Sequence, residues 1–137
     1  MPVSMEREFG PDHPIQIVAR YLELSSCRRL AEAQGCLDDH AQLIFPNGTF
    51  AGVEDMVQAT RSRYRSIAKT YVSWDVAYHE DGSVVVVSTG TLNGINSHGV
   101  PFSGVRYIDR FVLRDGKITL QQVWNDLAEA RVLERRE

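Results

Sequence analysis

The second half of the sequence contains four segments with the character of strands. In the first, apolar residues recur at every second position, and the second is β-branched almost throughout. These segments cover residues 67–78, 84–92, 105–113 and 117–124. A period of two places successive side chains on opposite faces of a strand, and Asp-Gly pairs such as Asp81-Gly82 and Asp115-Gly116 are typical of tight hairpin turns. The pattern therefore predicts an antiparallel meander of strands, and this meander restricts the fold more than any other feature.

The first half of the chain has the three-and-four spacing of amphipathic helices. Helices are expected from Pro14 to about Ser26, from about Arg28 to Gly35, and from Gly52 to about Tyr64. Residues 37–41 are interpreted as one further turn of helix, and residues 42–45 as a short strand that ends at a Pro-Asn-Gly turn. Asp126 and Glu129 have the spacing of a capping box, which predicts a last short helix ending near Leu133.

Helices followed by a twisted meander indicate an α+β fold, because such a sheet cannot cover its own concave face. We expect a cone-shaped, barrel-like roll in which the N-terminal helices pack on the concave face of a curved antiparallel sheet, with a cavity at the wide end. The length of 137 residues suits one domain. Residues 1–13 are expected to form a flexible N-terminal arm, and residues 14–137 the single domain.

Charge and motif content argue against several classes of partner. The formal net charge is −3 and the basic residues are scattered, so nucleic-acid binding is not expected. No stretch approaches eighteen apolar residues, which argues against a membrane span, and the polar N-terminus lacks signal-peptide features, which indicates a cytoplasmic protein. The histidines and cysteines lack metal-ligand spacing and no nucleotide motif is present, so we expect no metal and no cofactor.

Three stretches of the chain together suggest a family. They are Val18 to Leu24 followed by Leu37 to Ala41, Phe45 to Gly52, and Ile108 to Trp124. In their order and spacing these stretches resemble the superfamily named for nuclear transport factor two, which includes ketosteroid isomerases and SnoaL-like polyketide cyclases. The resemblance spans nearly the whole chain and implies the cone-shaped fold with a small-molecule pocket. The superfamily contains enzymes and plain binding modules, so the fold alone does not settle function.

The resemblance transfers known catalytic chemistry only in part. Ketosteroid isomerases use a carboxylate base, with a tyrosine and a protonated acid that stabilise the oxyanion. The tyrosine position matches Tyr21, but the base position falls on Phe45 and the acid position on Arg106. Limonene-epoxide hydrolases need an Arg-x-Asp pair and a further Asp, where this chain has Ser88-Thr89-Gly90 and Val123. Neither mechanism is therefore expected.

When the strand positions that face the cavity in the family are matched to this sequence, they predict a pocket of mostly apolar residues with a few polar groups. Its predicted members are Ser88, Arg106, Ile108, Leu120, Gln122 and Trp124, with Tyr21 and Phe45 from the opposite wall. This composition is typical of a ligand pocket. A buried guanidinium needs an acceptor. Arg106 therefore either receives an anionic or carbonyl-bearing substrate together with Tyr21, or pairs with an internal acid or a dimer interface.

Two residues are candidates for moving a proton. His98 lies in a glycine-bounded loop expected near the pocket mouth, and an imidazole exchanges its proton near neutral pH. The alternative interpretation is an exposed loop histidine. Asp126 is the second candidate because SnoaL-like enzymes use an acid in the pocket, whereas its capping-box spacing favours a structural role.

The resulting functional prediction is a SnoaL-like protein that acts on a small, carbonyl-bearing organic molecule. As an enzyme it would be a cofactor-free isomerase, cyclase or dehydratase with Tyr21, Arg106, His98 and Asp126 as catalytic residues. The alternatives are a ligand-binding protein without catalysis and a dimeric assembly module of the same fold. We also expect a homodimer, because large residues on both faces of the strands leave an apolar convex face to be covered.

Overall fold

The computed structural model of the protein describes residues 10–134, which form three helices and six strands. The helices are α2 (Pro14–Ser26), α3 (Leu30–Gln34) and α4 (Val53–Arg61). The strands are β1 (Leu37–Phe45), β2 (Gly48–Phe50), β3 (Tyr64–Tyr78), β4 (Val84–Asn96), β5 (Pro101–Arg114) and β6 (Lys117–Asn125). The arm expected over residues 1–13 lies, up to residue 9, outside the described residues.

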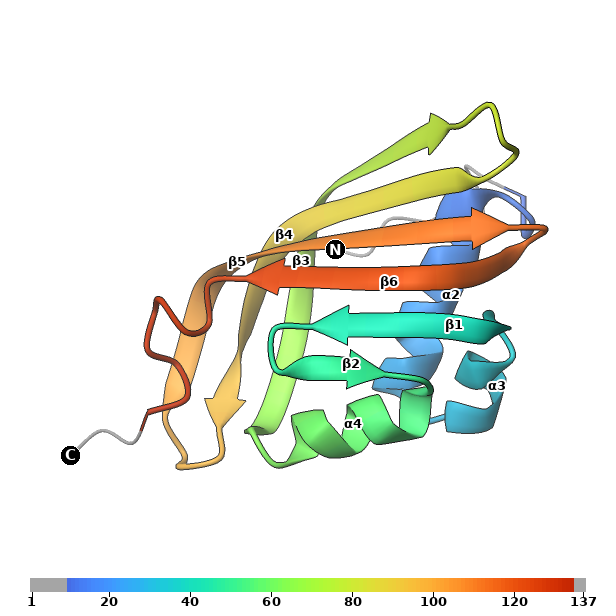
Figure 1. Cartoon of the computed structure of the whole chain (residues 1–137). Coiled ribbons are helices and arrows are strands. Elements are labelled where there is room, and N and C mark those ends of the chain that lie inside the picture. The colour runs from blue at the N-terminus through green and yellow to red at the C-terminus, as the bar shows by residue number, and fades with distance from the viewer. Residues whose placement is uncertain (1–9, 135–137) are drawn as a thin grey trace.

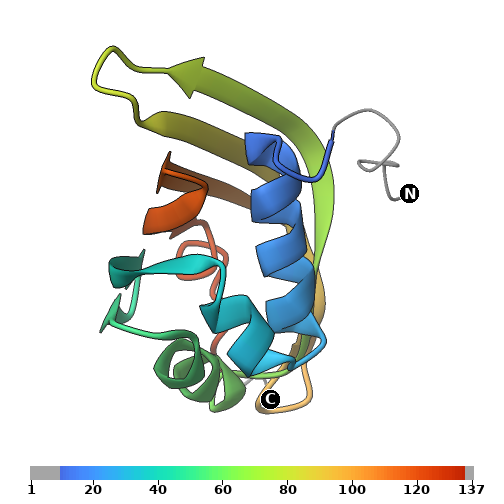
Figure 2. The same ribbon diagram turned by 90° about the vertical axis from the view of Figure 1, so that its right-hand side faces the viewer.

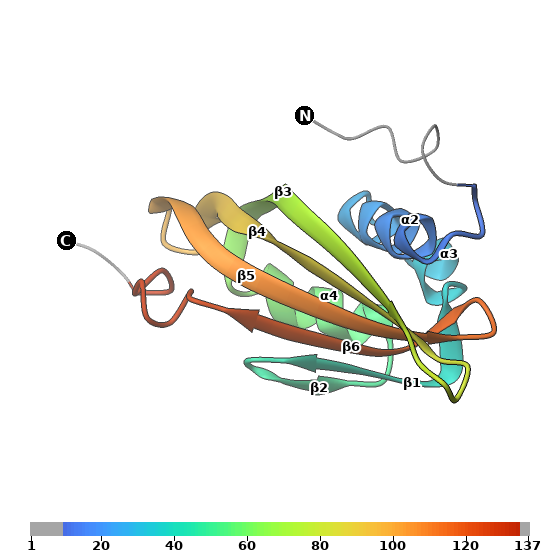
Figure 3. The same ribbon diagram turned by 90° about the horizontal axis from the view of Figure 1, so that it is seen from above.

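The six strands form one curved, unclosed sheet in the order β2-β1-β6-β5-β4-β3 (Figure 1). Strands β3 to β6 make the predicted antiparallel meander, whereas β1 joins β6 in parallel, so the sheet is mixed. Figure 2 shows α2 running along the concave side of the sheet, and Figure 3 shows α3 and α4 on that same side. The predicted α+β cone, with N-terminal helices on a curved sheet, is therefore confirmed.

Helix α2 begins and packs as its sequence predicts. Pro14 occupies the first turn, where its missing N–H and fixed φ cost nothing, and the His13 side chain accepts a hydrogen bond from the Ile15 amide at 3.1 Å. The buried residues of the helix, Ile15, Val18, Tyr21 and Leu24, follow helical spacing. This stripe faces the sheet and forms the centre of the main core. Within residues 10–134, no helix is long and apolar enough to cross a membrane.

Two local predictions are wrong. Residues 37–41 belong to strand β1, because Leu37 pairs with Ile118 of β6 and the edge of the meander offers these residues a hydrogen-bonding partner. Residues 126–134 form successive turns rather than a helix. The Asp126 carboxylate, expected to cap that helix, instead pairs with Arg106, and Arg131 has a φ of 58°, which no α-helix contains.

The curvature of the sheet has an identifiable origin in β3 and β4. The register between these strands shifts between Tyr71 and Ser73, which leaves Val72 as an extra residue opposite Gly90 and Thr89. A bulge of this kind bends the strand and increases its twist. At Gly90 the two strands approach so closely that an added Cβ would lie 2.0 Å from the Thr70 carbonyl oxygen. The bend therefore requires glycine at this position.

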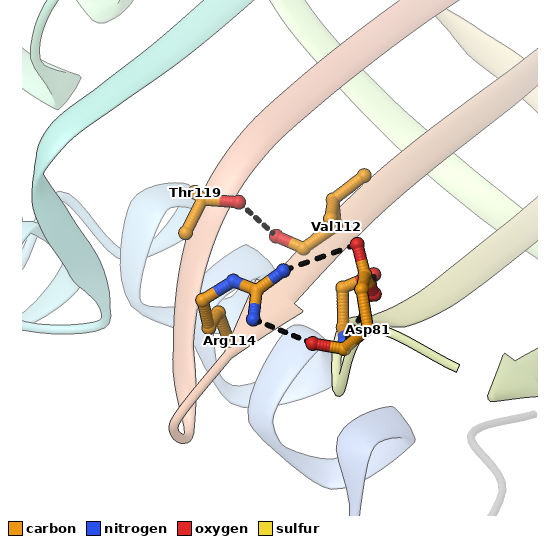
Figure 4. A network of polar contacts seen from close by, with 5 residues as sticks. Asp81, Val112, Arg114 and Thr119 are labelled. Atoms are coloured by element: carbon orange, nitrogen blue, oxygen red, sulfur yellow. Dashed lines mark hydrogen bonds and ion pairs between the residues drawn. The ribbon is translucent and has the colours of Figure 1, made fainter. Parts of the chain in front are cut away.

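Polar contacts join the β3–β4 and β5–β6 hairpins (Figure 4). Arg114, at the end of β5, donates to the Asp81 carbonyl oxygen at 2.9 Å and pairs with its carboxylate at 3.2 Å. Nearby, the Thr119 hydroxyl donates to the Val112 carbonyl oxygen at 3.1 Å, where the β5–β6 register shifts. Hydrogen bonds from Ser83 hold the pKa of Asp81 below its usual value.

The C-terminal segment, residues 126–134, packs against the concave face at the end that the helices leave uncovered. Its buried side chains Leu127 and Val132 belong to a second apolar cluster with Leu92, Val105 and Tyr107 of the sheet. The fully buried Asn96 fixes the segment, because its side-chain amide donates to the Val132 carbonyl oxygen at 2.6 Å. One wall of the concave face is therefore made by the chain's own C-terminal turns.

Candidate functional site

The concave face of the sheet carries different residues from those predicted. Strand β5 buries Val105, Tyr107, Asp109, Phe111 and Leu113, all in one phase. In β6 the buried residues are Ile118, which pairs with Leu113, and Gln121, which pairs with Phe111. Five side chains predicted to face the cavity therefore belong to the opposite, convex phase, and that prediction is wrong by one residue in each strand. They are Arg106, Ile108, Leu120, Gln122 and Trp124.

Exposure shows the error most clearly at Arg106. Its side chain is 82% exposed and lies 2.5 Å from the Asp126 carboxylate, whose residue also donates its amide to the Arg106 carbonyl oxygen at 3.0 Å. Arg106 and Asp126 thus fasten the start of the C-terminal segment to β5. Neither lies on the concave face, so the predicted contact of Arg106 with a substrate there is not formed.

The remaining predicted site residues are placed as follows. Ser88 and Tyr21 are fully buried on the concave side, as expected. His98 is exposed in the loop between β4 and β5. Phe45 contacts Phe50 and, with Gln122 and Trp124, lines a hollow of about 270 Å³ at the end of β1 and β6. That hollow is a surface feature and is separate from the concave cluster around Ser88.

A buried ion pair, Lys69 with Asp109, occupies the concave face. The ammonium of Lys69 on β3 contacts Oδ2 of Asp109 on β5, and the two side chains are 24% and 1% exposed. The second carboxylate oxygen, Oδ1, is buried and has no hydrogen-bond partner among residues 10–134. A buried charge is expensive to leave without a partner. Asp109 is therefore paired with Lys69 through Oδ2, while its Oδ1 has no partner among residues 10–134.

Tyr107 and Ser88 extend this polar group along the sheet. The Tyr107 and Ser88 hydroxyls lie 3.1 Å apart, and Lys69 Nζ lies 4.9 Å from the centre of the Tyr107 ring. The ring therefore supports the ammonium by a cation–π contact in addition to its carboxylate partner. Because Ser88 pairs directly with Asp109, its hydroxyl lies beside the ion pair on the same face.

Tyr21 comes from α2, above the sheet. Its hydroxyl donates to Gln121 Oε1 at 2.7 Å, and its ring lies edge-on to Phe111 at 6.2 Å. Burial and the nearby Asp109 carboxylate raise the pKa of Tyr21 well above its ordinary value. The phenol is thus a neutral donor whose proton is already engaged, and Tyr21 positions Gln121 in this structure.

Two aromatic residues of β3 complete the site. The rings of Tyr71 and Trp74 stack with centres 5.3 Å apart and planes 28° apart. Trp74 Nε1 is buried and has no hydrogen-bond partner within the described residues. Tyr71 remains 40% exposed. Lys69, Tyr71, Trp74, Tyr107, Asp109 and Gln121 are all site residues that the sequence interpretation did not select.

The tyrosine environment predicts a fall in stability at alkaline pH. Burial, followed by the Asp109 and Glu23 carboxylates, raises the pKa of Tyr71 from 10.0 to about 12. Between these values the unfolded chain has already lost the phenolic proton that the folded chain retains, so stability falls as pH rises through this window and is unaffected below it. Urea unfolding measured across this pH range should show that the free energy of unfolding falls less steeply for Tyr71→Phe than for wild type. An equally steep fall would contradict the assignment.

The site contains no obvious metal-binding arrangement. Among residues 10–134, no group of three or more His, Cys, Asp or Glu side chains is placed to hold a metal ion. What the geometry offers instead is a carboxylate with a free oxygen, an adjacent ammonium, an unused indole N–H and neutral hydroxyls. These groups can bind an organic molecule and exchange a proton with it.

Comparison with known proteins agrees with this architecture. Residues 18–121 match the SnoaL-like domain family, and no curated protein matches the chain. An NTF2-like protein of unknown function from Burkholderia pseudomallei shares the fold with a TM-score of 0.71 at 14% identity, over 93% of this chain and 100% of that one. TerC co-crystallised with polyporic acid shares the fold with a TM-score of 0.70 at 15% identity, over 92% of this chain and 100% of that one. ActVI-ORFA from Streptomyces coelicolor shares the fold with a TM-score of 0.62 at 15% identity, over 82% of this chain and 93% of that one.

These structural neighbours are too distant in sequence to show more than the shared fold, whereas the family match covers most of the domain. The matched range contains α2 from Val18 onward, the meander up to Gln121, and both members of the Lys69–Asp109 pair. The chain therefore belongs to the SnoaL-like domain family and has the NTF2-like fold.

Proposed function

We propose that this SnoaL-like domain binds a small, carbonyl-bearing organic molecule on its concave face and shifts a proton within it, as a cofactor-free isomerase, cyclase or dehydratase. The supporting observation is Asp109, whose Oδ2 is held by Lys69 while its buried Oδ1 has no partner among residues 10–134. TerC, which has the same fold, was co-crystallised with polyporic acid, which is consistent with an organic ligand.

In this proposal Asp109 is the group that takes and returns the proton. Lys69 fixes the carboxylate and supplies positive charge beside the negative charge that develops when a carbonyl compound loses a proton. Trp74 Nε1 is the donor available to the carbonyl oxygen, since the proton of Tyr21 already serves Gln121. These roles replace those first considered for Arg106 and Asp126. The catalytic role of His98 stays a prediction from the sequence.

The test is proton exchange at a carbon next to a carbonyl group. Keto–enol interconversion in D₂O replaces the hydrogens beside the carbonyl of 1-tetralone with deuterium, which NMR follows directly. We expect the protein to accelerate this exchange and Asp109→Asn to lose at least about a hundredfold of the acceleration, the usual contribution of an acid–base group. Asp75→Asn, on the exposed convex side of β3, is the matched control. Full acceleration by Asp109→Asn would refute the assignment.

The alternative is a binding protein without catalysis. It is favoured by the internal pairing of most polar groups on the concave face: Tyr21 with Gln121, Tyr107 with Ser88, and Lys69 with Asp109. Such a protein would be stabilised by a ketone in a thermal melt and would not accelerate exchange. The same two measurements therefore separate the two functions.

We also propose that the protein is a homodimer through the convex face of the sheet. Ile108 and Trp124 are directly paired across β5 and β6 on this face and are 46% and 51% exposed. Large apolar side chains left next to each other on an open sheet are usually covered by a partner. A second copy of the chain offers the same patch, as a two-fold interface requires.

Light scattering should therefore give twice the chain mass at micromolar concentration. Ile108→Glu places a charge at the centre of the patch and should give a monomer. Tyr78→Glu is the control, because Tyr78 is 71% exposed but belongs to the other phase of β3, opposite Val84. A wild-type monomer, or a dimer that Tyr78→Glu disrupts equally, would contradict this interface.

A further inference from the structure

Two Asn-Gly pairs occur in the chain, and the fold holds them in opposite ways. One is Asn47-Gly48, in the turn that joins β1 to β2, and the other is Asn93-Gly94, inside β4. In such a pair the backbone nitrogen of the glycine can attack the side-chain amide of the asparagine, because glycine has no Cβ to shield that nitrogen or to restrict the backbone. The freedom of the backbone at each pair therefore decides whether the attack occurs.

The backbone around Asn47 is weakly held. Phe45 pairs with Gly48, so Pro46 and Asn47 form a two-residue turn, and Asn47 is exposed. Strand β2, which follows the turn, has 3 residues that are half-buried or exposed, and it lies at the edge of the sheet beside β1. Segments with few buried contacts open at a small cost in free energy. The turn can therefore open while the rest of the sheet stays folded.

The side chain of Asn47 is also unrestrained. Among residues 10–134 it has no hydrogen-bond partner. The turn between β3 and β4 shows the opposite case at Asp81-Gly82. Asp81 Oδ1 accepts hydrogen bonds from the Ser83 amide at 2.9 Å and from the Ser83 hydroxyl at 2.7 Å. These bonds fix the Asp81 side chain, whereas the Asn47 amide can turn toward the nitrogen that follows it.

Asn93-Gly94 has the same chemistry and a rigid backbone. Strand β4 is bonded to β3 on one side and to β5 on the other, with Asn93 opposite Ala68 and Gly94 opposite Phe102. A Cβ added to Gly94 would lie 2.1 Å from the Ser66 carbonyl oxygen, which shows how closely β3 encloses this glycine. The attack would require β4 to separate from its neighbours, so the sheet protects this pair.

We propose that Asn47 is a site of spontaneous modification, at which the side-chain amide is converted to a carboxylate while Asn93 stays intact. The Gly48 nitrogen bonds to Cγ of Asn47, the Cγ–Nδ2 bond breaks, and Nδ2 leaves as ammonia with the proton that the Gly48 amide gives up. Water then opens one of the two C–N bonds of the resulting succinimide ring, adding hydroxyl to carbon and hydrogen to nitrogen. The product is aspartate or isoaspartate, depending on the bond that opens. This reaction needs only water and is independent of the proposed function.

The modification would change one wall of the hollow at the end of β1 and β6. Phe45 and Pro46 line this hollow together with Trp124. Both products place a negative charge beside these apolar side chains. Isoaspartate also lengthens the backbone of the turn by a methylene group, which no longer matches the pairing of Phe45 with Gly48. We therefore expect β2 to separate from β1 in the isoaspartate form alone.

The test is incubation of the purified protein at mildly alkaline pH, followed by mass spectrometry of proteolytic peptides. The peptide with Asn47 should gain the mass difference between an amide and an acid, at a rate that rises with pH because the attacking nitrogen must lose its proton. The peptide with Asn93 should react at least about tenfold more slowly, because it reacts only after the strands separate. In protein unfolded by urea, where the sheet protects neither pair, the two peptides should react at similar rates.

Two substitutions at Asn47 complete the test. Asn47→Gln keeps the amide but requires a larger ring, so this variant should keep its mass over the same period. Asn47→Asp has the charge on a normal backbone, so hydrogen exchange of residues 48–50 should match that of fresh wild type and should be faster only in aged wild type that contains isoaspartate. Equal rates for Asn47 and Asn93 in the folded protein would overturn the proposal. So would an Asn47 peptide that reacts in urea and keeps its mass in the folded protein.

Discussion

Lys69→Met is expected to lower the free energy of unfolding by about 3 kcal/mol, because the substitution leaves the Asp109 carboxylate buried without its partner. The carboxylate side chain is 1% exposed and its other oxygen already lacks a hydrogen bond within residues 10–134, so little else can compensate for the loss. Lys69 itself is 24% exposed, which places the expected value at the lower end of those for buried pairs. Urea unfolding at neutral pH measures the change.

A surface pair provides the matched control. Arg29 Nη2 lies 2.6 Å from Glu32 Oε1, and the two side chains are 61% and 46% exposed. Arg29→Met should therefore change the free energy of unfolding by no more than about 0.5 kcal/mol. The double variant Lys69→Met with Asp109→Leu should recover most of the loss, since apolar residues can replace a buried ion pair at little cost. A single Lys69→Met variant as stable as wild type would show that solvent reaches Asp109 and would weaken its role in the site.

The recovery in the double variant would have a functional meaning. If removing both charges restores stability but abolishes proton exchange, the pair is present for chemistry rather than for folding. Proteins often keep strained or costly groups at functional sites and compensate for them elsewhere.

The fold was predicted correctly because it depends on patterns that survive local errors. The period-two segments after Ile67 and the Asp-Gly turns specify a meander whatever covers it, and the stripe from Ile15 to Leu24 specifies the covering helix. The errors came where tertiary pairing decides. Residues 37–41 have no strong local preference, and they became a strand because the free edge of β6 was available to pair with them.

The site was less predictable, because a one-residue error in phase exchanges the two faces of a strand. Strand β5 nevertheless contained the signal. Its odd positions hold only one charged residue, Asp109, whereas its even positions hold Arg106, Arg110 and Arg114, and three arginines in one phase mark the solvent face. If the inward positions of β5 had been chosen from this alternation, and not from the positions that face inward in the family, Asp109 would have been selected. Its partner Lys69 had no such signal, because a register shift lies between it and Trp74.

A second unused signal was glycine inside a strand, which is typical of a bulge or of a close approach between backbones. Gly90 interrupts the β-branched run of β4, and Gly94 lies four residues later. An added Cβ at Gly94 would lie 2.1 Å from the Ser66 carbonyl oxygen, much as at Gly90. Both glycines lie beside register shifts, so the sequence marked where the sheet bends although it did not show in which direction.

Gly90→Ala is therefore expected to destabilise the protein by about 3 kcal/mol, at the upper end of the cost of overpacking. The added Cβ would lie 2.0 Å from the Thr70 carbonyl oxygen and 2.9 Å from Cε2 of Tyr107. Neither neighbour is a flexible chain end, so β3 must move away or the Tyr107 ring must turn. Gly10→Ala is the control, because no atom lies within 4 Å of its added Cβ, and thermal melts of the two variants measure the difference.

Whether β3 moves or the Tyr107 ring turns in Gly90→Ala shows which feature of the site depends on this glycine. If Tyr107→Leu restores most of the stability of Gly90→Ala, the ring is the obstacle, and Gly90 is present so that the Tyr107 hydroxyl can reach Ser88 at 3.1 Å. If the double variant stays destabilised, the Thr70 carbonyl is the obstacle, and Gly90 sets the curvature that brings Lys69 within reach of Asp109. We expect the second result, because the contact with the backbone is shorter by almost 1 Å and a backbone in a paired strand cannot rotate away. A Gly90→Ala variant as stable as Gly10→Ala would show that the bend of β3 over β4 is not fixed by this glycine.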